Sequence, residues 1–226
     1  QSTKETMDCI KKNIFLNQSN KIFFSDDFIY SVNENDFFYY EDKTGGLKLP
    51  MPNVIGQFQL ENISTAIATL RTLDIGIKDE HIQKGITKIS NLARLQEIKS
   101  GKLKDLVKNN ILIIDGSHNE DGARVLNEYL QTLKCNKHII IGMMTNKEHE
   151  KYISYFKDIS SITTIDLKTQ INSISGKDLK EKFKNIPNVK YQPDIEKAIK
   201  SINLKKGDLL LITGSLYGAA EVLSLN

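Results

Sequence analysis

A group of polar residues follows a short apolar run in the middle of the chain. Four aliphatic residues, 111–114, lead directly into Asp115-Gly116-Ser117-His118-Asn119. A carboxylate at the end of a buried strand can accept two hydroxyl hydrogen bonds from a ribose or help to hold a metal ion. Asn119 precedes two acidic residues, which is typical of a helix N-cap with an acidic first turn. The residues alone therefore fit either a plain strand–helix turn or a ligand site.

Two kinds of covalent catalysis are disfavoured at this turn. Ser117 and His118 are adjacent, so they do not readily form a nucleophile–base pair, and no G-x-S-x-G elbow surrounds the serine. An aspartyl-phosphate enzyme would use Asp115, but a serine stands two positions later instead of a second acid. The Gly-Lys pairs at 101–102 and 176–177 are followed by Leu and Asp, so neither forms a P-loop.

Composition is that of an ordinary globular chain. Its 226 residues suffice for one large or two small domains. A net charge of +3 without a basic, aromatic-bearing stripe predicts no nucleic-acid partner. Cys9 and Cys135 lie far apart and fit a reducing, cytoplasmic compartment. No apolar run approaches the roughly 18 residues that span a bilayer, so no membrane partner is predicted. The chain begins at Gln1, and we expect a fragment or a processed product.

The first half of the sequence predicts helices and short antiparallel strands. Ile63 and Ile67 belong to a helical repeat of apolar residues, which predicts an amphipathic helix over 56–73. Further helices are expected near 5–15 and 79–89. Short β-rich runs separated by turn residues predict a meander. These runs are 21–24, 28–32, 37–40 and 47–50.

From about residue 97 the pattern changes to alternating strands and helices. Runs rich in Ile and Leu predict strands at 111–114, 138–144, 161–167, 189–191 and 208–214. Helices are expected at 120–133, 148–158, 177–185 and 194–202. Such alternation predicts a parallel sheet covered on both faces, with ligands beyond the carboxyl ends of the strands. Asp115, the Met143–Lys147 turn and Gly214-Ser215 all fall at such ends.

Four segments, taken in order, resemble the folylpolyglutamate and dihydrofolate synthases of the Mur ligase superfamily. IIDGSHNEDGARVL is similar to their L-D-G-A-H-N-P-x-G-A signature, and GQFQLENISTAIATL to the G-x-H-Q-x-x-N-A helix of their central ATPase domain. LARLQEI resembles the P-G-R-[FL]-[EQ] hinge, and ITGSLYGAAEVL the final T-G-S-L-Y-x-x-G-x-V-L. Each motif alone is weak, but their order and spacing agree over nearly the whole chain.

The resemblance implies an α/β fold with two parts. Residues 94–226 would form the Rossmann-like C-terminal (glutamate ligase) domain, with a mostly parallel sheet. Residues 1–93 would be a truncated part of the central P-loop ATPase domain, with antiparallel strands plus two helices. The family's P-loop, metal ligands and carbamylated lysine all precede the matched part. We therefore expect a C-terminal portion that does not catalyse ligation alone and that contributes no metal ligand itself.

The resemblance also implies a reaction. Such enzymes use ATP to phosphorylate a carboxylate of a pterin-bearing substrate, and the amine of glutamate attacks the acyl phosphate. ATP and Mg²⁺ are thus the implied cofactors. Glutamate and folate or pteroate are the implied substrates, and the missing N-terminal part is a possible partner. Two alternatives stay open: a non-catalytic α/β binding or assembly module from a split or degraded gene, and a fragment of a cell-wall Mur ligase. The GSLY ending and the DGSHN turn favour the folate branch.

Three residues match family positions that contact the nucleotide. Asn62 matches the asparagine at the adenine, where a carboxamide can donate and accept together. Arg94 matches the hinge arginine that reaches the phosphates with a planar, permanently charged fork. Asp115 matches the acid that holds the ribose. Without the resemblance, Asn62 is a polar position on an amphipathic helix and Arg94 a candidate for an interdomain salt bridge.

Four more residues match the cleft and the substrate end. His118 and Lys147 are the catalytic candidates, the lysine near the incoming amino acid. Ser215 and Tyr217 would receive a glutamate carboxylate. The alternatives are a capping or packing histidine, a solvated lysine and a structural turn serine, which are common in proteins.

The chain departs from the family pattern at several positions. Ala93 replaces the hinge glycine and is expected to stiffen the hinge. Glu120 replaces the proline after the asparagine, and Phe58 stands where histidine is common. Asn146 replaces the acid before Lys147, which weakens the role inferred for the lysine.

Overall fold

The chain forms two compact units, residues 1–90 and 91–226, in a computed structural model. The structure describes residues 4–17, 22, 25–33, 37–73 and 75–226. The strand expected at 21–24 lies outside these described residues, apart from Ile22, which is not in a strand.

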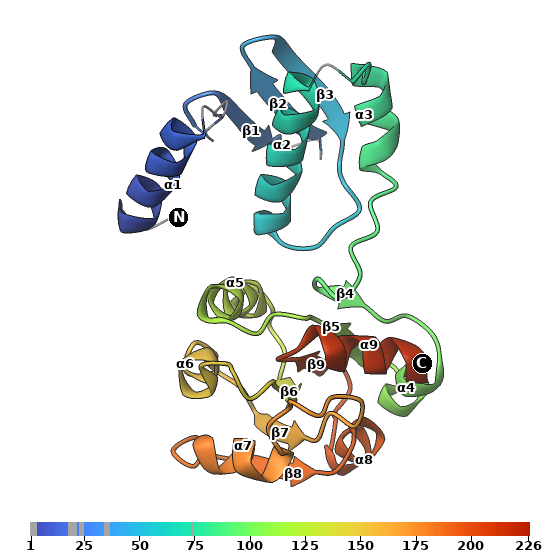
Figure 1. The fold of residues 1–226 in the computed structure, drawn as a ribbon. Coiled ribbons are helices and arrows are strands. Elements are labelled where there is room, and N and C mark those ends of the chain that lie inside the picture. The colour runs from blue at the N-terminus through green and yellow to red at the C-terminus, as the bar shows by residue number, and fades with distance from the viewer. Residues whose placement is uncertain (1–3, 18–21, 23–24, 34–36, 74) are drawn as a thin grey trace. The chain divides into compact units, whose positions relative to one another are not determined.

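The first unit combines an antiparallel sheet with helices (Figure 1). Its elements are α1 Lys4–Leu16, β1 Phe28–Val32, β2 Phe37–Asp42, β3 Gly45–Pro50, α2 Gln57–Thr72 and α3 Asp79–Ile86. Side chains alternate along β2, so Phe38 and Tyr40 are buried while Tyr39 between them is exposed. The buried pair meets Ile63 and Ile67, the inward residues of α2, in one core. The amphipathic pattern of 56–73 therefore marks the helix that covers this sheet.

The second unit is built on a six-stranded sheet of order β4-β5-β9-β6-β7-β8. Its elements are β4 Gln96–Glu97, α4 Lys102–Val107, β5 Ile111–Ile114, α5 Glu120–Gln131, β6 Lys137–Ile141, α6 His149–Ser154, β7 Ser161–Ile165, α7 Gly176–Lys182, β8 Val189–Gln192, α8 Ile195–Ser201, β9 Leu209–Thr213 and α9 Leu216–Leu225. Strands β5 to β9 pair in parallel, and the short edge strand β4 is antiparallel to β5. The α/β class and the mostly parallel sheet expected from the sequence are confirmed.

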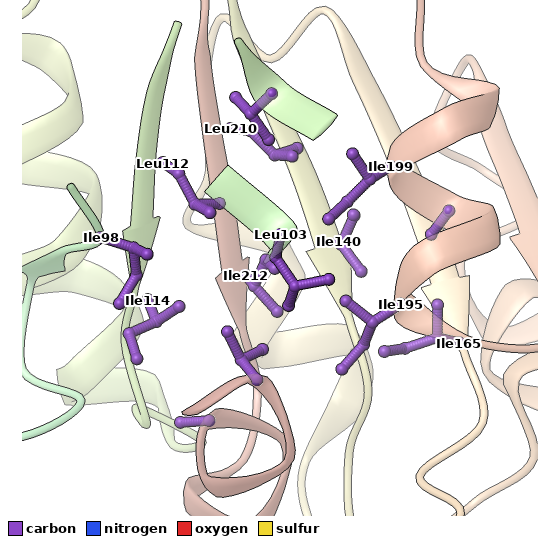
Figure 2. Close-up of a cluster of buried hydrophobic side chains, with 14 of the residues drawn as sticks. Ile98, Leu103, Leu112, Ile114, Ile140, Ile165, Ile195, Ile199, Leu210 and Ile212 are labelled. Carbon is purple, nitrogen blue, oxygen red and sulfur yellow. The ribbon is translucent and has the colours of Figure 1, made fainter. Parts of the chain in front are cut away.

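Helices cover both faces of this sheet (Figure 1). Helices α5, α6 and α7 lie on one side, and α4, α8 and α9 lie on the other. Every residue of β6 and β9 is buried, as expected of central parallel strands. Figure 2 shows the second face, where Ile140 and Ile212 from neighbouring strands pack against Leu103 of α4 and Ile195 of α8. The carboxyl ends of five parallel strands are thereby held at one edge by a buried apolar core.

Several elements differ from the sequence-based expectation. Strand β6 ends at Ile141 rather than at residue 144, because the backbone of Met143 and Met144 pairs with the loop after β7 instead. Neither α4 nor α9 is predicted. Helix α4 has six residues, too few to show a helical period, and the small residues of α9 blur its pattern. No helix among the described residues has the length and apolar character needed to cross a bilayer.

Candidate functional site

Asp115 organises the turn that follows β5. One carboxylate oxygen, Oδ1, accepts a hydrogen bond from the backbone N–H of Ser117 at 2.8 Å. The other, Oδ2, accepts one from the backbone N–H of Leu95, also at 2.8 Å. The side chain is only 3% exposed. Asp115 therefore joins the polar turn to the segment that carries Arg94.

That segment is held in an unusual backbone conformation. Ala93 and Leu95 are both buried and left-handed, with φ of 55° and 47°. Such a conformation costs about 1–2 kcal/mol for a residue with a Cβ. It is maintained by bonds from Gly116 N to the Ala93 carbonyl at 2.8 Å and from Ala93 N to Oε1 of Gln96 at 2.9 Å. Arg94 lies half-buried between the two anchors, and no described residue pairs with its guanidinium. A permanent charge is thus left available at this edge.

His118 has a defined tautomer. Its Nδ1 lies 2.9 Å from the carbonyl oxygen of Gly116. A carbonyl can only accept, so in the neutral ring this contact favours the tautomer with the proton on Nδ1, and Nε2 then has no partner among the described residues. The ring is half-buried. His118 can therefore accept a hydrogen bond or a proton through Nε2.

Two helices begin at this edge with side-chain caps. Oδ1 of Asn119 accepts from the N–H of Gly122 at 2.9 Å and caps α5, as its sequence context predicts. Oγ of Ser215 accepts from the N–H of Tyr217 at 3.1 Å and caps α9. The tyrosine side chain itself is exposed. Ser215 and Tyr217 thus stand at the start of a helix whose first turn carries no acid.

The turns after β5 and β9 lie against each other. The N–H of Gly214 donates to the carbonyl of Ser117 at 3.1 Å. Gly214 has a φ of 99°, and a Cβ there would lie 2.8 Å from the carbonyl oxygen of Gly142. A Cβ on Gly116 would lie 2.3 Å from Cδ2 of Leu216. Gly214 is favoured by its positive φ and by the close approach of the Gly142 carbonyl, whereas a Cβ on Gly116 would displace the side chain of Leu216.

Three buried hydroxyls also meet below this turn, and the sequence analysis does not identify them. Oγ of Ser117 lies 2.9 Å from the hydroxyl of Tyr152, which lies 2.8 Å from Oγ1 of Thr213. Ser117 and Thr213 are 3.4 Å apart. Burial raises the pKa of the Tyr152 phenol, so the group stays protonated. The three residues come from β9, α6 and the turn after β5, and no local motif links them.

Lys147 lies in the loop after β6, which is fastened to the loop after β7. The carbonyl of Met143 accepts from Ile174 N at 3.1 Å, and the N–H of Thr145 donates to Asn172 O at 2.9 Å. Lys147 is half-buried, and none of the described residues forms an ion pair with it. Its amine is therefore available at the same edge of the sheet.

Six of the seven predicted site residues belong to the second unit, and all six lie at or just beyond the carboxyl edge of its sheet. Asn62 belongs to the first unit, where it is exposed on α2 and donates to Oε1 of Gln59 at 3.4 Å. Among the described residues, no group of three or more His, Cys, Asp or Glu side chains could hold a metal ion.

Comparison with known proteins decides the family. The Mur ligase family, through its glutamate ligase domain, matches residues 94–216, more than half of the sequence. The chain belongs to the Mur ligase family. The resemblance drawn from the four segments is confirmed at this level.

Curated relatives of this Mur ligase chain are dihydrofolate synthase/folylpolyglutamate synthases. The protein of Bacillus subtilis is 25% identical over 178 residues, 75% of this chain and 39% of its own length. That of Haemophilus influenzae is 27% identical over 184 residues, 73% of this chain and 42% of its own length. The Mur ligase chain thus spans less than half the length of these relatives.

Solved structures share the fold of this Mur ligase chain. A bifunctional folylpolyglutamate synthase/dihydrofolate synthase from Yersinia pestis has a TM-score of 0.79 and 21% identity, covering 96% of this chain and 50% of its own. Folylpolyglutamate synthase from Thermotoga maritima has a TM-score of 0.74 and 21% identity, covering 100% and 54%. Another structure of the Yersinia protein, with a TM-score of 0.78 and 21% identity over 96% of this chain and 50% of its own, is complexed with AMPPNP and a manganese ion.

Proposed function

We propose that this chain is the C-terminal portion of an ATP-dependent folate ligase. The enzyme would join glutamate to a folyl or pteroyl carboxylate through an acyl phosphate. In this proposal residues 94–226 are the glutamate ligase domain, and residues 1–93 are part of the central ATPase domain. The dihydrofolate synthase/folylpolyglutamate synthase relatives support it. A cytoplasmic location belongs to the same proposal.

The proposal rests chiefly on the bond between Asp115 and Leu95. Through it the end of β5 holds the segment that presents Arg94, while Asp115 itself begins the turn that presents His118. Each carboxylate oxygen offers two acceptor positions and spends one on a backbone N–H, so one position per oxygen is left for a ribose hydroxyl. A charged fork, an acceptor for hydroxyls and an imidazole nitrogen without a partner among the described residues therefore lie at one edge of the sheet.

These residues can divide the work of amide formation. ATP, when bound, supplies the phosphoryl group that activates the carboxylate. Arg94 would neutralise phosphate charge, since its guanidinium has no competing carboxylate among the described residues. Nε2 of His118 would accept a proton from the amine of glutamate. Lys147 and the start of α9, with Ser215 and Tyr217, would receive its carboxylates. Mg²⁺ belongs to the same proposal, and its ligands would come from the N-terminal part of the enzyme.

Nucleotide binding tests the proposal directly. We expect titration calorimetry to show ADP binding by the chain. R94Q should weaken this binding by about tenfold or more, because a charge-assisted hydrogen bond contributes about 1.5–3 kcal/mol. R124Q is the matched control, since Arg124 is paired with Asp121 and Glu128 on α5. Absence of ADP binding would favour the non-catalytic module, and equal losses in both variants would remove Arg94 from the site.

A ligation assay tests whether the chain acts alone. With ATP, glutamate and pteroate, we expect no steady-state turnover, because the sequence contains no P-loop to hold the triphosphate. Addition of a separately expressed N-terminal portion that carries a P-loop should restore turnover. Clear turnover by the isolated chain would refute the predicted inactivity.

A further inference from the structure

Helix α6 is fastened to the turn after β5 at two positions. Ser117 bonds to Tyr152 inside the protein. Glu120 lies 3.4 Å from Nζ of Lys151 and accepts from the hydroxyl of Tyr155 at 3.3 Å. Both contacts therefore join α6 to the start of α5 and the turn before it.

The buried contact is the stronger of the two. Ser117, Tyr152 and Thr213 are all buried, and their hydroxyls satisfy one another in a closed set. Removing one hydroxyl would leave its neighbours without a full set of partners in a dry environment, which is costly. The Glu120–Lys151 pair is exposed on both sides and contributes little by itself.

The backbone at the start of α5 is not fixed by the residue type there. Glu120 is the first residue of α5, and a proline at that position would fix φ near the helical value. Glutamate does not fix φ, so the conformation of the turn before α5 depends on its contacts. Asn119 has φ −136° and ψ 169°, an extended conformation that the residue before a proline can adopt. The backbone is thus compatible with proline, although the sequence does not supply it.

We propose that Tyr152 is a positioning residue. Its hydroxyl fixes the turn that carries His118 relative to helix α6 and to the Lys147 loop that precedes this helix. Helix α6 begins two residues after Lys147, and its Tyr152 bonds to Ser117, the residue before His118. The hydroxyl set of Ser117, Tyr152 and Thr213 thereby constrains the turn before α5. This inference rests on the proposed function only for what the two residues do, not for how they are held.

The tautomer of His118 reports the positioning without any ligand. In ¹⁵N–¹H spectra of the full chain, with His118 assigned by an H118Q variant, we expect wild type to show the Nδ1–H form alone. Y152F should show both tautomers, because the turn that directs Nδ1 to the Gly116 carbonyl loosens. S117A removes the same hydrogen bond from the other partner and should also produce both tautomers. An unchanged His118 pattern in Y152F would overturn the proposal.

A rescue separates positioning from general stability. E120P fixes φ at the first residue of α5, so the E120P/Y152F double variant should return the single tautomer. Y191F is the control, because it removes another tyrosine hydroxyl bond, from Tyr191 to Asp166 at 2.6 Å, on the distant strand β8. Y191F should leave His118 unchanged. If E120P does not rescue, or if Y191F changes His118 as Y152F does, Tyr152 is merely structural.

Binding connects this inference to the proposed function. Y152F should weaken ADP binding by about three- to tenfold, the effect of one lost hydrogen bond. Failure of wild type to bind ADP would contradict the proposed function, while the His118 spectra would still decide the positioning role.

Discussion

The carboxylate of Asp115 holds the backbone N–H of Leu95 at 2.8 Å, across 20 positions of sequence. The end of a buried parallel strand is thereby joined to a segment with two left-handed residues, whose Arg94 has no ion-pair partner among the residues that the structure describes. Because Asp115 also accepts from the N–H of Ser117, one side chain sets both parts of the candidate site.

Replacing Asp115 by asparagine should be costly. The amide offers only one acceptor oxygen and turns its NH₂ toward a backbone donor, so one buried N–H loses its partner. We expect D115N to lower the free energy of unfolding by about 2–3 kcal/mol in urea denaturation. D121N, on the exposed first turn of α5, is the control and should cost less than about 1 kcal/mol. If both variants lost the same free energy of unfolding, the two buried hydrogen bonds of Asp115 would not contribute more than an exposed ion pair.

Glycine at position 93 should be tolerated, because Ala93 is left-handed with φ of 55°. Glycine removes that strain but adds freedom to the unfolded chain, and the two effects are of similar size. We expect A93G to leave the free energy of unfolding unchanged or to raise it by up to about 1 kcal/mol. A123G, in helix α5, should instead lower it by about 1 kcal/mol. If A93G lowered the free energy of unfolding as much as A123G does, the left-handed backbone of Ala93 would not be strained.

Asn226 caps a helix that has no capping side chain of its own. Its Oδ1 accepts from the N–H groups of Leu103 at 3.1 Å and Lys104 at 3.3 Å, and its Nδ2 donates to Ser100 O at 2.6 Å. N226A should lower the free energy of unfolding by about 1–2 kcal/mol, the usual cost of losing an N-cap. N203A, at an exposed asparagine, should change it by less than about 0.5 kcal/mol. Calorimetric melting of both variants measures these changes, and equal effects of N226A and N203A would contradict the capping role of Asn226.

Glu221 should make the protein less stable as the pH rises. Burial raises the pKa of its carboxyl, and Oε2 is the one buried polar side-chain atom without a partner among the described residues. A raised folded pKa means that the folded state binds more protons than the unfolded state, so stability is lost on going up from about pH 4.5 through that pKa.

Substitution of Glu221 removes this pH dependence. We expect E221Q to be about 1 kcal/mol more stable than wild type at pH 7, with the difference shrinking toward pH 5. Urea denaturation between pH 5 and pH 8 measures this difference, with E181Q, at an exposed position of α7, as the control. A wild-type profile parallel to that of E221Q would rule out Glu221 as the source.

Asp208 should act with the opposite sign. Burial would raise its pKa, but hydrogen bonds from the Lys205 N–H, Asn136 and His138 outweigh burial and lower it. The contribution of Asp208 is therefore present above about pH 4 and lost as the pH falls through the lowered value. D208N should cost about 1–3 kcal/mol at pH 7, and less at pH 3. D158N, at an exposed aspartate, is the control, and its effect on the free energy of unfolding should not differ between pH 7 and pH 3.

Local patterns were sufficient for the main elements of the fold. The Ile- and Leu-rich runs predicted parallel strands because a strand buried on both faces must be apolar throughout, and Ile63 and Ile67 predicted the helix that covers the first sheet. The N-cap of α5 was also predicted, since Asn119 and the two acidic residues after it are neighbours in sequence. Helix α4 was not predicted, because six residues are too few to show a helical repeat and because its capping residue, Asn226, is distant in sequence.

The sequence by itself determined the fold class, the family and the set of polar residues at the strand ends, because each depends on residue types at short spacing. Only the tertiary structure decided what those residues touch. The bond from Leu95 to Asp115, the contact of His118 Nδ1 with the Gly116 carbonyl and the bond of Ser117 with Tyr152 join segments or orient rings in ways that spacing does not specify. Such contacts depend on the order in which parallel strands pair, and that order is set by packing of the whole sheet.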